Sequence, residues 1–231
     1  LFYRLGDFYE MFFEDALTVS KELEITLTGK DCGLDERAPM CGVPYHAVES
    51  YLYRLVQKGY KVAIAEQVED PKLAKGLVKR EVIRVVTPGT ITSVQALDET
   101  KNNYLMGIVC MDGIYGISTA DITTGDFMVT EVDSDRELFD EINKFSPSEI
   151  ICNNAFYMSG VDLEELKNRY HVVISALDSR FFGDESCRRV LREHFRVGHL
   201  SGLGLTDYGT GIIAAGAVMQ YMYETQKNTL E

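Results

Sequence analysis

Residues 104–132 consist of three short apolar segments separated by turn-forming residues, and this spacing constrains the fold more than any other feature of the chain. The segments are 104–111, 114–122 and 127–132, joined by Asp112-Gly113 and by Thr-Thr-Gly-Asp at 123–126. Links of these types are typical of β-hairpins. The sequence therefore predicts a meander of three antiparallel strands.

Alternating helices and strands follow the predicted meander. Ser134 and Glu137 have the spacing of a capping box, and Leu138, Ile142 and Phe145 would face inward from the helix that they begin. The remaining predicted elements are a strand at 149–152, a helix at 162–170, a strand at 171–175, a helix at 184–195 and a helix of small residues at 207–226. This order predicts an α/β layer fold, and it resembles the ribonuclease-H-like architecture. We expect this second domain to span residues 104–226.

Residues 1–92 predict a separate first domain, of α+β type, with a mixed sheet and flanking helices. The predicted strands are 1–5, 61–68 and 82–86, and the predicted second helix is 45–58. For the first helix, Asp7 would be the N-cap and one face would present Phe8, Phe12, Ala16, Val19 and Leu23. Gly29–Glu36 has the composition of a polar loop, and Thr87-Pro88-Gly89-Thr90 matches a type II turn.

The boundary between the two predicted domains falls in a polar, weakly patterned stretch at 93–103. The chain begins with Leu1 rather than Met, and its last residues continue a helical pattern. We therefore interpret it as part of a longer protein, in which 227–231 would begin a further domain.

Charge is distributed unevenly between the two halves of the chain. The net charge is −13, which argues against a general nucleic-acid binder. Residues 1–97 hold 12 Lys and Arg against 14 Asp and Glu, so the acidic excess lies in the second half, and residues 54–84 are net positive. Two interpretations remain open: the first half faces a polyanion, or these are ordinary solvated charges.

The motif Gly6-Asp7-Phe8-Tyr9-Glu10 admits a structural and a functional interpretation. Asp7 and Glu10 have capping-box spacing, and Phe8 would extend the apolar helix face into the core. Alternatively, Phe8 projects as a wedge between base steps, which costs least where base pairing is already faulty. A carboxylate such as that of Glu10 would then be useful only against a base edge, because phosphates repel it.

Four stretches in order resemble the mismatch-binding domain of the MutS family. They are Gly-Asp-Phe-Tyr-Glu-Met-Phe at 6–12, Pro-Met-Cys-Gly-Val-Pro-Tyr-His at 39–46, Ala-Ile-Ala-Glu-Gln-Val-Glu-Asp-Pro at 63–71 and Arg-Val-Val-Thr-Pro-Gly-Thr at 84–90. The resemblance implies that Phe8 stacks on the mispaired or unpaired base from the minor groove and that Glu10 hydrogen-bonds this base. Tyr9 occupies the variable middle position, where we expect packing.

Further DNA contacts are implied by the same resemblance. Lys30 and Arg80 are similar to positions of the family that contact the DNA backbone, although surface solubility is an equally good explanation for both. Met40, Tyr45 and His46 belong to the second motif and would line the DNA-facing edge or pack inside the domain. The expected ligand is mismatched or bulged double-stranded DNA.

The second domain resembles the connector domain of the same family. This resemblance implies that it relays the state of the DNA to ATPase domains absent from this chain and offers a surface to a MutL-type partner. It also implies ATP and magnesium in the full-length protein, a homodimer, and a bacterial cytoplasmic location on the nucleoid. We expect no cofactor in the present chain, which contains no Gly-x-x-x-x-Gly-Lys-Ser/Thr motif.

A metal-dependent nuclease is the alternative function from a different class. Asp112, Asp121 and Asp126 cluster near the predicted hairpins and would bind Mg²⁺ if they converged. Aspartate is also favoured in turns for purely structural reasons, which is the better explanation here. The four histidines have no metal-ligand spacing.

The cysteines and the apolar segments exclude two further classes of protein. The five cysteines are odd in number and form no Cys-x-x-Cys motif, which predicts free thiols rather than disulfides or a zinc site. The longest apolar stretch, 211–219, is about half as long as the ~20 residues that a membrane span needs.

Overall fold

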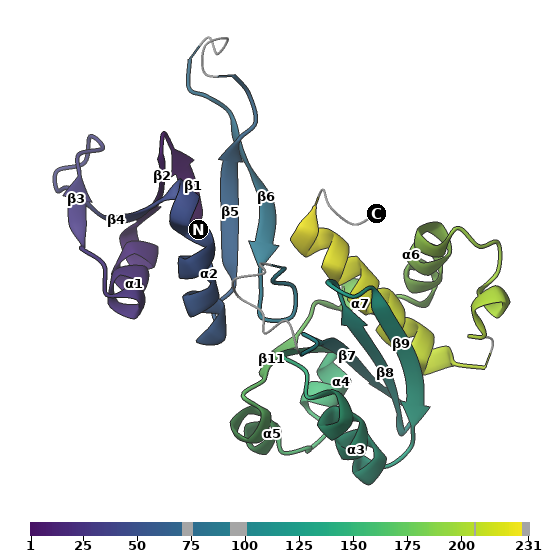
Figure 1. The fold of residues 1–231 in the computed structure, drawn as a ribbon. Helices are drawn as coiled ribbons and strands as arrows, with labels where there is room; N and C mark the ends of the chain where they lie inside the picture. Colours follow the sequence, from purple (N-terminus) through teal and green to yellow (C-terminus); the bar gives the residue numbers. More distant parts are fainter. Residues whose placement is uncertain (71–75, 93–100, 206, 228–231) are drawn as a thin grey trace. The chain divides into compact units, whose positions relative to one another are not determined.

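The computed structural model describes residues 1–70, 76–92, 101–205 and 207–227, and the chain forms two compact units (Figure 1). The first unit is built mainly from Leu1–Thr87, and the second mainly from Pro88–Thr92 and the residues up to Glu224. Most of the predicted linker (93–100) and most of the predicted start of a further domain (228–231) lie outside the described residues.

The first unit contains a six-stranded mixed sheet with the order β3-β4-β2-β1-β5-β6. The strands are β1 (Phe2–Leu5), β2 (Phe8–Phe12), β3 (Thr28–Lys30), β4 (Ala38–Pro44), β5 (Val62–Gln67) and β6 (Arg80–Val86). Strands β1 and β5 pair in parallel, and the other neighbours are antiparallel. The predicted mixed sheet is confirmed.

Two helices, α1 (Phe13–Leu23) and α2 (Val48–Gln57), pack on one face of this sheet (Figure 1). The core between them is apolar: the sheet contributes Phe2, Tyr9, Met11, Cys41 and Val43, and the helices contribute Ala16, Val19, Leu23, Leu52, Leu55 and Val56. The Cys41 thiol lies 3.5 Å from the Ala16 carbonyl oxygen, which identifies the odd-numbered residues of β4 as facing α1.

The prediction of a helix from Asp7 is wrong, because residues 8–12 form strand β2 and the helix begins at Phe13. A spacing of four residues, as between Phe8 and Phe12, is compatible with one face of a helix and with one face of a strand. The chain instead reverses at Gly6, whose φ of +58° suits a turn, and β2 pairs with β1 and β4. Ala16, Val19 and Leu23 do form the buried face of α1.

Two other local predictions also need correction. The segment predicted as a polar loop, 29–36, begins inside strand β3, which ends at Lys30. Strand β4 follows the loop. Gly89 lies in a turn, but its φ is outside the left-handed region that a type II turn requires. Glycine is favoured there by close approach, since an added Cβ would lie 3.0 Å from the Cβ atoms of Glu149 and Leu105.

The second unit contains a five-stranded sheet with the order β11-β10-β7-β8-β9. The strands are β7 (Leu105–Met111), β8 (Ile114–Asp121), β9 (Asp126–Val132), β10 (Glu149–Cys152) and β11 (Val173–Ala176). The antiparallel meander β7-β8-β9 is followed by β10 and β11, both parallel to β7. This is the predicted ribonuclease-H-like topology. Asp112 and Gly113 both have positive φ, as a tight two-residue hairpin turn requires.

Helices cover both faces of this second sheet (Figure 1). They are α3 (Asp135–Phe145), α4 (Asn154–Tyr157), α5 (Leu163–Tyr170), α6 (Asp184–Phe195) and α7 (Gly209–Gln226), of which α4 was not predicted. Leu138 of α3 and Leu166 of α5 pack in one cluster with Met106 and Ile108 of β7. On the other face, Ile213 and Ala214 of α7 pack against Val109. Ser134 caps α3 as predicted.

Glycines allow α7 to approach the sheet and α6 very closely. A Cβ added to Gly107 would lie 2.5 Å from a methyl carbon of Val218, and one added to Gly116 would lie 2.3 Å from the Thr210 carbonyl oxygen. Gly216 meets Cys187 of α6 in the same way, with 2.2 Å to its Cβ. Gly216 of α7 and the glycines of β7 and β8 therefore permit this close packing.

The described cysteines are all free thiols, as predicted. Burial raises the pKa of Cys41 to about 11 and those of Cys152 and Cys187 to about 12. None of the helices in the described ranges has both the length and the apolar composition that crossing a bilayer needs.

Candidate nucleic-acid interface

Strand β2 presents Phe8 and Glu10 on the face of the first sheet opposite α1 and α2. Side chains alternate across a strand, so Tyr9 and Met11 point into the helix-covered core while Phe8, Glu10 and Phe12 share the other face. The Phe8 side chain is 47% exposed, whereas Tyr9 is only 6% exposed. We call the face that contains Phe8, Glu10 and Phe12 the open face.

The turn before Phe8 is held by several contacts from the helix side of the sheet. The Asp7 carbonyl oxygen accepts a hydrogen bond of 2.9 Å from the Tyr45 backbone N–H. Arg4 donates to the Gly6 carbonyl oxygen through Nε, and its guanidinium carbon lies 3.8 Å from the centroid of the Tyr45 ring. These contacts fix the position from which the Phe8 ring projects.

Tyr9 is anchored beneath the open face. Its hydroxyl donates a hydrogen bond to Glu66, which also pairs with Arg4 at 3.4 Å. Burial raises the pKa of Tyr9 to about 12, and the bond to the Glu66 carboxylate adds to this effect. The expectation that Tyr9 packs inside the domain is confirmed.

Glu10 forms an ion pair with Lys30 on the open face. The Lys30 Nζ lies 2.5 Å from the Glu10 Oε2, and it also lies 5.5 Å from the centroid of the Phe12 ring. The Lys30 side chain is 40% exposed and that of Glu10 is 16% exposed. The structure therefore brings together two of the predicted site residues that are 20 positions apart in the sequence.

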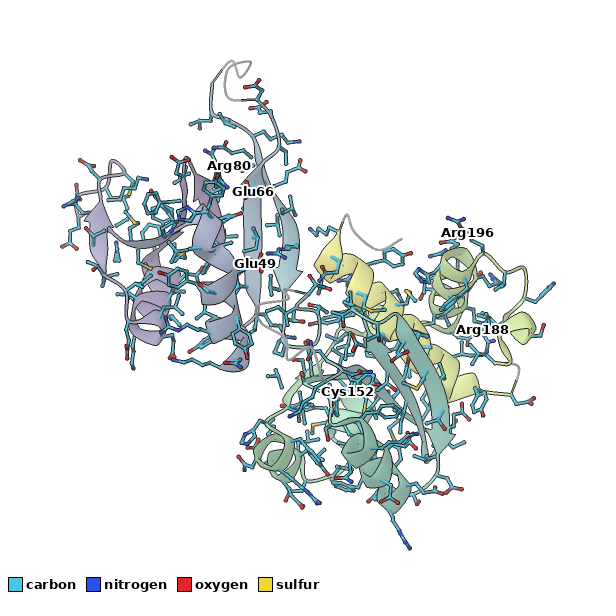
Figure 2. All side chains as sticks on the ribbon, viewed as in Figure 1. Glu49, Glu66, Arg80, Cys152, Arg188 and Arg196 are labelled. Carbon is cyan, nitrogen blue, oxygen red and sulfur yellow. The ribbon has the colours of Figure 1, made fainter. Side chains whose placement is uncertain are left out.

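Arg80 begins strand β6, two residues before the predicted start of this strand, and lies on the same face of the sheet. Its Nε donates to the Arg4 carbonyl oxygen at 2.7 Å, and its guanidinium carbon lies 5.2 Å from the centroid of the Tyr3 ring. Tyr3 is directly opposite Glu10 in the β1–β2 pairing, so it belongs to the open face. Figure 2 shows Arg80 and Glu66 toward one end of the β5–β6 pair.

The three residues singled out in the second motif lie in different surroundings. Met40 is paired with Phe12 across β4 and β2, so it lies on the open face. Tyr45 is half-exposed but packs against Arg4 and lies edge-on to the neighbouring His46 ring at 5.8 Å. His46 is exposed beside it.

Gly42 is a residue of this site that the sequence prediction missed. It is paired with Glu10, and an added Cβ would lie 3.7 Å from the Glu10 Cγ and 3.8 Å from the Phe8 Cδ1. The stretch Ala38–Pro44 has no alternation of apolar and polar residues that would have predicted a strand, so the sequence offered no signal that places Gly42 beside them.

Two family profiles match the chain, one over each unit. The profile of MutS domain I matches residues 1–95, and that of MutS domain II matches residues 103–231. The chain belongs to the MutS family. All eight residues of the second motif lie in the domain I match, together with Phe8 and Glu10.

Bacterial MutS proteins are similar to the whole of this chain. The protein from Lachnoclostridium phytofermentans, described as DNA mismatch repair protein MutS, is 64% identical over 230 residues, covering 100% of this chain and 25% of the relative. The proteins of the same description from Acetivibrio thermocellus and Ruminiclostridium cellulolyticum are 53% and 51% identical, covering 100% of this chain and 26% of each relative. The chain thus spans about a quarter of the length of these MutS relatives.

The carboxylates considered for a nuclease have structural roles in this MutS domain II. Asp121 is buried and accepts hydrogen bonds from the backbone N–H groups of Asn103 and Thr123 at 2.9 and 2.8 Å. Asp112 forms the hairpin turn, and Asp126 accepts from the Asn102 side chain. Across the described ranges, no group of three or more His, Cys, Asp and Glu residues is arranged to hold a metal ion. The nuclease alternative is therefore not supported.

Proposed function

We propose that this chain recognises mispaired or unpaired bases in double-stranded DNA as part of a MutS mismatch-repair protein. The observation that supports it most directly is the exposure of Phe8 on a paired strand, beside a buried Tyr9 and an acidic Glu10. An aromatic ring on a rigid element can enter a base step without ordering a loop.

Phe8 would act as the wedge. Inserting it from the minor groove unstacks a base step at a cost of a few kcal/mol, and this cost is lowest where pairing is already faulty. Stacking of the ring on the displaced base would return about 1–3 kcal/mol. Selectivity would then come from how easily the duplex deforms, not from a code of base contacts.

Glu10 would hydrogen-bond the base that Phe8 displaces. Both side chains project from the same face of β2, two residues apart, so their Cα atoms are separated by about 7 Å along the strand. This spacing lets one residue stack on a base while the other reaches its edge. Arg80, Lys30 and Met40 border the pair and would contact the backbone or the groove wall, with the two cations neutralising phosphates.

Domain II would connect the DNA-binding unit to the rest of the protein. Residues 98–231 contain 11 Lys and Arg against 22 Asp and Glu, so a DNA backbone would be repelled, whereas a protein partner would not. We propose that it relays the DNA state to ATPase domains outside this chain and contacts a MutL-type partner. ATP and magnesium would bind to those other domains, in a homodimer associated with the bacterial nucleoid in the cytoplasm.

Binding of three duplexes to a full-length MutS that carries this chain tests the proposal. The duplexes contain a G·T mispair, one unpaired base, or only matched pairs, and each is titrated with magnesium present. We expect tighter binding of the first two and no cleavage of any duplex. Equal affinity for all three would overturn the proposed function.

A further inference from the structure

The Glu10–Lys30 ion pair occupies both of its members before DNA arrives. Glu10 is the residue proposed to meet a base, and Lys30 is one of the cations proposed to meet a phosphate, yet the Lys30 Nζ lies 2.5 Å from the Glu10 Oε2. A carboxylate held at this distance takes one of the three N–H donors of Lys30 and offsets its charge, so a phosphate gains less from contacting it. Neither member can engage DNA fully while the pair persists.

The exposure of the two side chains makes an exchange of partners possible. Lys30 is 40% exposed, so a phosphate can approach its ammonium group from solvent. Partly exposed ion pairs of this kind contribute little to stability, so exchanging one anion for another costs little. Glu10, in contrast, is only 16% exposed, so water replaces Lys30 poorly, and Glu10 keeps its stabilisation on leaving the pair only when another hydrogen-bond donor is offered.

We propose that Glu10 competes with DNA phosphate for Lys30, so that Lys30 contacts the backbone fully only when a displaced base takes over Glu10. The inference rests on the proposed function, because the base that takes over Glu10 is the one that Phe8 is proposed to displace at the mispair. Matched DNA leaves Glu10 on Lys30 and loses one phosphate contact. Mispaired DNA releases Lys30, and Lys30 becomes a residue that determines specificity.

A simpler explanation is that Glu10 merely repels the DNA backbone. Both explanations predict that Glu10→Ala tightens binding to matched DNA. Only the competition requires Lys30 for that gain, because the gain consists of a Lys30–phosphate contact. The two are therefore separated by removing Lys30 in the same protein.

The experiment is a double-mutant cycle of Glu10→Ala and Lys30→Met, measured on matched duplex as a function of salt in full-length MutS carrying this chain. Each phosphate contact adds about 0.9 to the slope of log affinity against log salt. We expect Glu10→Ala to tighten matched binding and to steepen the slope by about one unit. In the Lys30→Met background, Glu10→Ala should change neither the affinity nor the slope.

A matched control uses Lys79, which pairs with Glu81 in the same unit, away from Glu10. Glu10→Ala should still tighten matched binding when Lys79→Met is present, and Lys30→Arg should restore the effect lost in Lys30→Met. All three mutated positions are at least partly exposed, and far-ultraviolet circular dichroism verifies that each variant is folded.

A gain from Glu10→Ala that persists in Lys30→Met would overturn the competition and favour simple repulsion. No gain from Glu10→Ala in either background would also overturn it. Because the cycle uses only matched DNA, it reports on the competition even if the parent protein shows no mismatch preference. Absence of a mismatch preference in the parent protein would instead refute the proposed function.

Discussion

Gly42 lies directly opposite Glu10 in the β2–β4 pairing, and its missing side chain leaves the surface between Glu10 and Phe8 open. An added Cβ would contact the Glu10 Cγ at 3.7 Å and the Phe8 Cδ1 at 3.8 Å without a clash. It would also lie 3.3 Å from the Tyr9 carbonyl oxygen, which is tight but tolerable with a small shift. The space used by the proposed base contact is thus kept free by a glycine.

Gly42→Ala should therefore weaken mismatch recognition without unfolding the domain. Alanine in a strand is favoured over glycine by roughly 0.5–1 kcal/mol, which offsets the close approach to Tyr9, so we expect the free energy of unfolding to change by less than about 1 kcal/mol. The preference for mispaired over matched duplex should fall several-fold, because the new methyl group fills the gap between the two recognition residues. Urea unfolding and duplex titrations measure the two effects, and an unchanged preference would refute the role of this gap.

Tyr9 should make the first unit sensitive to alkaline pH. Its pKa is raised from 10 in the unfolded chain to about 12 in the fold, chiefly by burial. The fold therefore favours the neutral phenol, so this contribution is complete below pH 10 and is lost as the pH rises through 12.

Comparison of Tyr9→Phe with the parent at pH 9 and pH 11 measures this contribution. The variant should be less stable at pH 9 by about 1 kcal/mol, since the hydrogen bond to Glu66 is gone. At pH 11 Tyr9 ionises in the unfolded parent, which lowers the stability of the parent, whereas phenylalanine does not ionise. The difference in stability between variant and parent should therefore shrink. A difference that grows between these pH values would contradict the assignment.

The contact between α6 and α7 should not tolerate a methyl group at Gly216. An added Cβ there would lie 2.2 Å from the Cys187 Cβ and 2.4 Å from its Cα, so the helices would have to separate. Overpacking of this kind costs about 1–3 kcal/mol. Gly209→Ala is the matched control, because it lies in the same helix and its Cβ would meet nothing within 4 Å. Equal denaturant midpoints for the two variants would show that this packing is not as close as described.

The meander of the second unit was predictable because its signals are local. Asp112-Gly113 supplies the two positive φ values of a tight turn within two residues, and the flanking segments are apolar. Ser134 and Asp162 each accept a hydrogen bond from the backbone N–H three residues later, so the starts of α3 and α5 were also set locally.

The first unit was less predictable because its strands depend on distant partners. Strand β4 contains Pro39, Gly42 and Pro44, which disfavour strands in isolation, and it forms because β2 and β3 pair with it on both sides. The same pairing with β4 also makes residues 8–12 a strand, β2, where the sequence pattern predicted a helix. Family resemblance led to the hypothesis that Phe8 and Glu10 contact DNA, but the Glu10–Lys30 pair depends on the sheet and could not be derived from the sequence.

Replacing Phe8 tests the central claim most directly, with Leu17→Ala as the control. Leu17 is a large apolar side chain of similar exposure, 43%, but it lies on α1, on the covered side of the sheet. Affinities of full-length MutS carrying each variant are measured for a G·T duplex and a matched duplex. We predict that Phe8→Ala brings the ratio of the two affinities to about one, because the variant loses the roughly 1–3 kcal/mol expected for base stacking. Leu17→Ala should preserve the ratio of the parent. A folded Phe8→Ala protein that still prefers the mispaired duplex as strongly as its parent would contradict the account.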